Sequence, residues 1–195
     1  MDWLRNWDHG LFLKINGLSE SWLDYILGWP TFLGEETILL SILLLFFLIW
    51  DAKKGMGKYM ATVIGAISVG MLVRLLKVLV SRDRPYQFFY DAIDRNEVVV
   101  NFLYKMNVSA SFPSGHATFA FSVAVLLNLY YGHKLKFLYP IAFLIAFSRI
   151  YVGAHFPLDV IGGIVVGVGG SILFYRLVGK KFPELVEPVL PDFLK

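Results

Sequence analysis

The 195-residue chain contains no cysteine, which excludes disulfide bonds, metal sites built on thiolates and catalysis by a cysteine nucleophile. Charged residues are also scarce. They make up 17% of the chain, against about 25% in an average soluble domain. The net charge of +3 is too small to indicate binding of nucleic acid. Residues 1–17 mix charges of both signs and lack a long apolar core, so they do not form a cleavable signal peptide.

Apolar residues are abundant instead, at 57% of the chain and a mean hydropathy of +0.62. Long apolar runs between charged clusters predict membrane-spanning helices. The length suits one domain over residues 1–195, without a separate soluble catalytic part. We therefore predict an all-α membrane bundle of about six transmembrane helices, over Trp22–Leu33, Thr37–Trp50, Gly57–Val80, Gly115–Tyr131, Leu135–Val152 and Leu158–Val178. The first two ranges are shorter than the roughly 20 residues that a bilayer requires, so a re-entrant first segment and five crossings are the alternative.

The orientation of this bundle follows from its basic residues. Lysines and arginines gather after the second and fourth spans and in the tail, at Lys53, Lys54, Lys58, Lys134, Lys136, Arg176, Lys180 and Lys181. The positive-inside rule places these segments in the cytoplasm. Residues 34–36, 82–113 and 153–157 then lie on the extracytoplasmic side. Residues 2–17 carry apolar residues at helical spacing, which predicts an amphipathic helix lying on the membrane surface.

Three polar clusters interrupt the apolar background, and all of them fall at span ends on the extracytoplasmic side. Their patterns are K-x6-R-P, P-S-G-H and S-R-x5-H-x3-D, with Lys77, Arg84, Ser114, Gly115, His116, Arg149, His155 and Asp159 as the residues of interest. Ionisable residues at membrane level are costly, so they usually have a partner or a function. A helical bundle would bring the three clusters together.

The clusters predict a site for a phosphate group. Lys77, Arg84 and Arg149 are three cations without an equal set of carboxylates, which favours an anion with several oxygens. Ser114 and Gly115 begin a span, where backbone N–H groups would face the same anion. We find no cluster of Asp and Glu for Mg²⁺ on this side, so we expect a site without metal or cofactor.

Two histidines complete the predicted site. Asp159 lies one helical turn after His155, so its carboxylate would orient the imidazole and leave the second ring nitrogen free to attack phosphorus. His116 would protonate the leaving lipid oxygen and then activate water against the phosphohistidine. The cations would stabilise the charge on the transferred phosphoryl group.

The three motifs resemble those of the type-2 phosphatidic acid phosphatase superfamily, the lipid phosphate phosphatases. All eleven motif positions are filled in order within residues 77–159. The resemblance implies a six-helix membrane fold and the roles just described. It also implies a bacterial enzyme of the inner (cytoplasmic) membrane acting on undecaprenyl diphosphate, phosphatidylglycerol phosphate or lipid A 1-phosphate. We rank the isoprenyl diphosphate first, because further cations at Arg82, Arg95 and Lys105 could hold a second phosphate.

Other interpretations stay open. The same residues would serve a phosphotransferase, a non-catalytic lipid-binding protein or scramblase on the same scaffold, or a vanadate haloperoxidase, although the apolar spans argue against the last. Several charged or titratable residues are expected to have structural roles only: Glu35 and Glu36 at a span end, Arg82 and Asp83 paired with each other or holding the loop, and His9 and His133 solvated in the cytoplasm. Glycines of the last span predict close helix packing. The oligomeric state is not determined by the sequence.

Overall fold

The computed structural model describes residues 2–50, 55–104 and 109–186, and every regular element in these ranges is helical. The predicted all-α class is therefore confirmed. The elements are α1 (Asp2–Asn16), α2 (Ser21–Leu33), α3 (Glu36–Trp50), α4 (Met56–Val80), α5 (Pro85–Phe88), α6 (Tyr90–Asp94), α7 (Gly115–Tyr130), α8 (Leu138–Tyr151), α9 (Pro157–Phe174), a π-helical turn η1 (Tyr175–Gly179) and α10 (Phe182–Val186).

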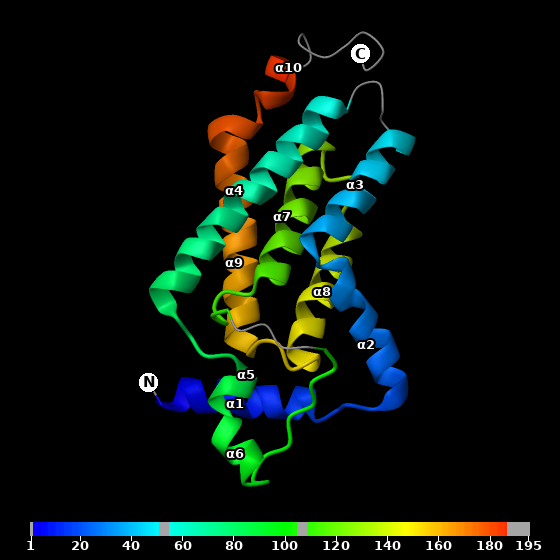
Figure 1. Ribbon diagram of the computed structural model, residues 1–195. Coiled ribbons are helices and arrows are strands. Elements are labelled where there is room, and N and C mark those ends of the chain that lie inside the picture. Colours follow the sequence, from blue (N-terminus) through cyan, green and yellow to red (C-terminus); the bar gives the residue numbers. More distant parts are fainter. Residues whose placement is uncertain (1, 51–54, 105–108, 187–195) are drawn as a thin grey trace.

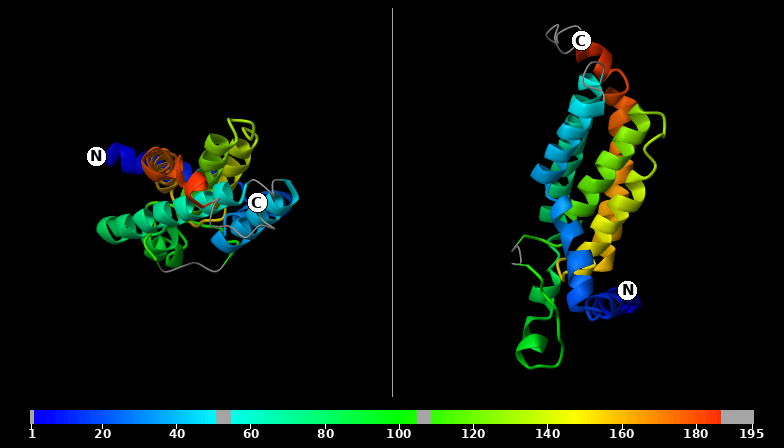
Figure 2. Two further views of the ribbon diagram at one scale, coloured as in Figure 1. Left: turned by 90° about the horizontal axis from the view of Figure 1, so that it is seen from above. Right: turned by 90° about the vertical axis from the view of Figure 1, so that its right-hand side faces the viewer.

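The long helices run side by side as an elongated bundle, and α1 crosses one of its ends (Figures 1 and 2). Helices α5 and α6 lie at the same end as α1, while α10 lies at the other. Helix α7 is in the centre and packs against α4, α8 and α9. It begins deeper in the bundle than the neighbouring ends of α8 and α9 (Figure 1). The chain before α7 therefore enters the bundle and places the P-S-G-H motif inside it.

Small residues explain how closely α7 and α9 approach each other. A Cβ atom added to Gly163 would lie 2.6 Å from the carbonyl oxygen of Ser114, and one added to Gly167 would lie 2.6 Å from that of Thr118. Neither distance is sterically possible without moving backbone. The predicted close packing is confirmed at these two glycines, whereas Gly169 faces open space.

The predicted count of six spans is not confirmed. Within the described residues, Met56–Asp94 and Pro157–Gly179 contain helices long and apolar enough to cross a membrane. Helices α2 and α3 pass the same test only as a pair, and they are bent by 76° at the break between them. Helices α7 and α8 are apolar but shorter. Large apolar side chains on the outer faces of α2, α3 and α4 are exposed, as expected of a surface in contact with lipid.

Residues Asp2–Asn16 form helix α1, whose predicted position on the membrane surface stays a prediction, and the surroundings of this helix differ from those expected. Its residue His9 stacks against Phe88 and Phe156, with ring centroids 4.2 and 4.6 Å away. Burial lowers the pKa of His9 from its usual value. The prediction of a solvated His9, remote from the motifs, is therefore wrong.

Candidate active site

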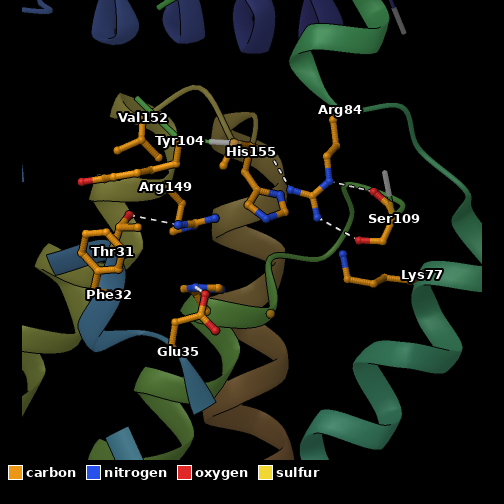
Figure 3. Close-up of a pocket in the computed structure, with 13 residues that line it drawn as sticks. Thr31, Phe32, Glu35, Lys77, Arg84, Tyr104, Ser109, Arg149, Val152 and His155 are labelled. Atoms are coloured by element: carbon orange, nitrogen blue, oxygen red, sulfur yellow. Dashed lines mark hydrogen bonds and ion pairs between the residues drawn. The ribbon is translucent and has the colours of Figure 1, made fainter. Parts of the chain in front are cut away.

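A cavity of about 440 Å³ lies among α2, α4, α7 and α8, where the loop before α7 enters the bundle. Six of the eight predicted site residues line it: Lys77, Arg84, Gly115, His116, Arg149 and His155. Figure 3 shows the side chains of Lys77, Arg84, Arg149 and His155 converging from different elements. Ser114 and Asp159 do not line the cavity but lie directly behind it, fully buried.

His155 lies in the link between α8 and α9 and is 2% exposed. Its backbone N–H donates to the carbonyl of Arg149 at 3.1 Å. The link turns at Gly153, which has a φ of +80° and no room for a side chain beside the carbonyl oxygen of Asn101. Burial lowers the pKa of His155 to about 3, against the smaller opposing effect of Asp159. The ring is therefore neutral at neutral pH, as a nucleophile must be.

Ser111 separates the histidine from the carboxylate that was expected to orient it. The distance from His155 Nδ1 to Asp159 Oδ2 is 3.7 Å, which is too long for a hydrogen bond. Ser111 Oγ instead lies 3.2 Å from Nδ1 and donates to Asp159 Oδ2 at 2.5 Å. Since the hydroxyl proton points to the carboxylate, the serine oxygen accepts from Nδ1–H. This assignment leaves the lone pair on Nε2, the nitrogen that is free to attack.

Lys77 and Arg84 are held by uncharged oxygens. Arg84 donates to the carbonyl and hydroxyl oxygens of Ser109 at 2.7 and 3.0 Å, and to the carbonyl of Ala154 at 3.1 Å. Lys77 donates to the carbonyls of Ala110 and Ser111. Because these partners carry no charge, both side chains keep their positive charge for a ligand.

Arg149 has an N–H group that is available to a ligand. Its Nη1 donates to Thr31 Oγ1 at 3.0 Å, and Thr31 is also 3.0 Å from the hydroxyl of Ser148. Its Nε is buried and has no hydrogen-bond partner among the described residues. An unpaired buried N–H on a guanidinium is unfavourable unless a ligand accepts from it. The cavity is thus lined by three cations that together can bind a polyanion.

His116 faces Glu35, for which the sequence predicted only a structural role at a span end. Its Nε2 lies 3.4 Å from Glu35 Oε1, at the break between α2 and α3. A Cβ atom on Gly34 would lie 2.7 Å from His116 Cδ2, so the glycine permits this close approach. Glu35 lines the cavity. The interpretation of Glu35 as a plain span end is wrong.

The start of α7 presents fewer backbone donors than expected. The N–H of Ser114 donates to the backbone carbonyl of Asp159 at 2.9 Å, so the prediction that it would face the anion is wrong. The first hydrogen bond within α7 runs from Thr118 N to Ser114 O, which leaves the N–H groups of Gly115 and His116 without an intrahelical acceptor. The space beside Gly115 is open. Gly115 thus remains a candidate phosphate-binding residue.

Arg82 does not pair with Asp83 as expected. Its guanidinium bridges Asp159 and Asp8, a residue of α1. Arg95 pairs with Glu97 at 2.8 Å on the exposed surface, and Lys105 lies outside the described residues. The argument that Arg82 and Arg95 are available for a second phosphate is therefore wrong. The sequence shows the charge of Arg82 and Arg95 but does not indicate which residues they pair with.

The chain is similar in sequence and in fold to known membrane phosphatases. Residues 58–183 match the family model described as the PAP2 superfamily. The chain is 29% identical over 186 residues to undecaprenyl-diphosphatase BcrC of Bacillus subtilis, covering 93% of this chain and 86% of that protein. It is 28% identical over 187 residues to lipid A 4'-phosphatase of Porphyromonas gingivalis, covering 91% and 75%. The crystal structure of Aquifex aeolicus LpxE superposes with a TM-score of 0.70 at 30% identity, covering 86% of this chain and 93% of that one.

Proposed function

The chain belongs to the PAP2 superfamily and is a membrane lipid phosphatase, and from this premise we propose that it hydrolyses a lipid phosphomonoester or diphosphate through a phosphohistidine formed on His155. One observation carries this proposal. Three cations that, among the described residues, donate to carbonyl and hydroxyl oxygens and to no carboxylate surround a cavity that also contains two histidines. Such a cavity matches a phosphate group in charge and in the number of hydrogen-bond donors.

The reaction proceeds in two steps. In the first, His155 Nε2 attacks phosphorus while the bond from phosphorus to the lipid oxygen breaks, and His116 transfers a proton to that oxygen. In the second, His116 takes a proton from water, the water oxygen attacks phosphorus, and the bond to Nε2 breaks. Free phosphate leaves and both histidines return to their starting protonation states. Lys77, Arg84 and Arg149 stabilise the negative charge of the phosphoryl oxygens in both steps.

Phosphate release from a panel of lipids tests the proposed function and its independence from metals. The purified protein in detergent should release phosphate from at least one of undecaprenyl diphosphate, lipid A phosphate and phosphatidylglycerol phosphate. The rate should be unchanged by EDTA, because the side chains supply the positive charge. Vanadate should inhibit by imitating five-coordinate phosphorus. Loss of activity on chelation and its recovery with Mg²⁺ would contradict the mechanism, and transfer of the phosphoryl group to a second alcohol instead of water would favour a phosphotransferase.

The proposed location is the bacterial cytoplasmic membrane, with the active site on its extracytoplasmic face. We treat α2 and α3 as one broken span, which gives five crossings and leaves α1 at the same end as the cavity (Figure 1). The turn between α7 and α8 and the segment after η1 lie at the opposite end (Figure 1). These two segments carry Lys134, Lys136, Lys180 and Lys181, which supports a cytoplasmic position for that end.

Cysteine labelling tests this orientation, since the natural chain has no cysteine. Val99 is 79% exposed in the loop on the cavity side, and Lys136 is exposed in the turn before α8. In intact cells, a membrane-impermeant thiol reagent should label Val99→Cys and leave Lys136→Cys unlabelled until the cells are opened. The reverse pattern would place the active site in the cytoplasm.

A further inference from the structure

Helix α1 has a buried face that an anchor on the membrane surface does not need. Its outer side exposes Trp3 and Trp7, at 73% and 45%. Its inner side buries Asp8, Phe12 and Asn16 completely. Phe12 packs in the core beside Phe89 and Phe156. A buried carboxylate such as Asp8 is costly unless it is paired, so its partners indicate what the helix does.

Asp8 binds two groups that adjoin the active site. Its Oδ2 accepts from Arg82 Nη2 at 2.5 Å, and its Oδ1 accepts from the backbone N–H of Leu158 at 2.8 Å. Leu158 belongs to the first turn of α9, where backbone N–H groups have no acceptor within the helix. Asp8 therefore supplies this acceptor from another element. The next residue of the same turn is Asp159.

Arg82 connects Asp8 to the residues that orient His155. Its Nη1 donates to Asp159 Oδ1 at 2.7 Å, and its guanidinium lies over the ring of Phe156 at 4.4 Å. Its backbone carbonyl accepts from the N–H of Ser111 at 2.7 Å. The side chain of Arg82 thus positions the carboxylate, and its main chain positions the serine. These are the two residues beside His155 Nδ1.

We propose that Asp8 and Arg82 are positioning residues for the nucleophile, so that α1 is part of the catalytic apparatus. This inference rests on the proposed role of His155. Arg82 occupies Asp159 Oδ1, while Ser111 Oγ and the N–H of Phe156 occupy Oδ2. The carboxylate is consequently held on both oxygens. Its orientation is passed to His155 through the Ser111 hydroxyl, which directs Nε2 towards the bound phosphate.

The test begins with Asp8→Asn, which keeps the shape of the side chain and an acceptor for Leu158 but removes the charge that holds Arg82. We expect kcat to fall by roughly 10- to 100-fold, the usual range for residues that orient a reactive group from behind it. KM should change by less than about threefold, because Asp8 does not line the cavity. Asp2→Asn is the matched control. Asp2 is on the same helix and is exposed, and its carboxylate lies 3.5 Å from the guanidinium of Arg5. Removing the charge of Asp2 should therefore leave kcat unchanged.

A double variant separates positioning from a general loss of structure. If Asp8 acts through Asp159, then Asp8→Asn combined with Asp159→Asn will be no slower than Asp159→Asn alone, because the pathway is already broken. If Asp8 only stabilises the fold, the two rate losses will multiply and the melting temperature in detergent will fall with them. Multiplying losses, or a kcat for Asp8→Asn within twofold of wild type, would overturn the proposal. Full activity of Asp159→Asn itself would instead show that the proposed role of the carboxylate had failed.

Discussion

Replacing His155 by asparagine should abolish phosphate release from every lipid, with a loss of at least about 10⁴-fold, as expected when a covalent nucleophile is removed. Asparagine is preferred to alanine because His155 is only 2% exposed, and the smaller residue would leave a cavity that destabilises the fold. The amide nitrogen can still donate to Ser111 Oγ, which contacts Nδ1 in the natural protein. The chemistry is thereby lost while the local contacts are kept.

His133→Asn is the matched control for this experiment. His133 has a φ of +60° in the turn after α7, a conformation that asparagine tolerates, and it does not line the cavity. Its replacement should leave turnover unchanged. Acid-labile phosphate bound to the protein after a rapid quench should appear in wild type and in the His133 variant but not in His155→Asn. More than a few per cent of wild-type turnover in His155→Asn would remove His155 from the role of nucleophile.

Replacing His116 by alanine should lower turnover of lipid substrates by about 10²- to 10⁴-fold, the usual contribution of a general acid–base group. A lipid alkoxide is a poor leaving group without a proton, so formation of the phosphohistidine slows. Hydrolysis of the intermediate also slows, because the base that activates water is missing. Glu35 Oε1, at 3.4 Å from His116 Nε2, would stabilise the protonated ring that donates in the first step and forms again in the second.

The choice of substrate distinguishes the two duties of His116. With p-nitrophenyl phosphate the leaving group needs no proton, so the first step should recover in His116→Ala while the second does not. The variant should then release one equivalent of nitrophenolate in a burst and accumulate phosphohistidine. Slow, linear release without a burst would mean that His116 is not the group that activates water. That outcome would leave the assignment of His155 as the nucleophile unchanged.

Helix positions along the chain were predictable where they depend on local sequence. The predicted span Gly115–Tyr131 corresponds to α7, Gly115–Tyr130, and the span Gly57–Val80 corresponds to α4, Met56–Val80. In both cases a long apolar run is bounded by polar or glycine residues, and hydropathy alone locates such a helix. The break between α2 and α3 was harder to interpret. The two helices are bent by 76°, and Gly34 at the break lies against His116 of α7, a contact between distant residues that no local pattern reports.

The candidate site was predictable in its residue types and less so in its contacts. Lys77, Arg84 and Arg149 were identified because unpaired cations at membrane level are rare, and all three line the cavity. Ser111 was missed because a serine before a helix is common and its hydroxyl becomes informative only beside His155. Glu35 was missed because an acidic residue at a span end has an ordinary explanation.

The sequence by itself determined that this protein is a helical membrane phosphatase, because apolar runs and motif spacing are properties of neighbouring residues. Only the tertiary structure decided how the site is held. Asp8, Arg82 and Asp159 are far apart in the chain, and they meet because α1 crosses the end of the bundle and Arg82 follows the last turn of α4. Each of these charges taken alone is compatible with a solvated surface. The burial of the two carboxylates around Arg82 depends on the packing of α1 against α8 and α9, and that packing is a property of the whole fold.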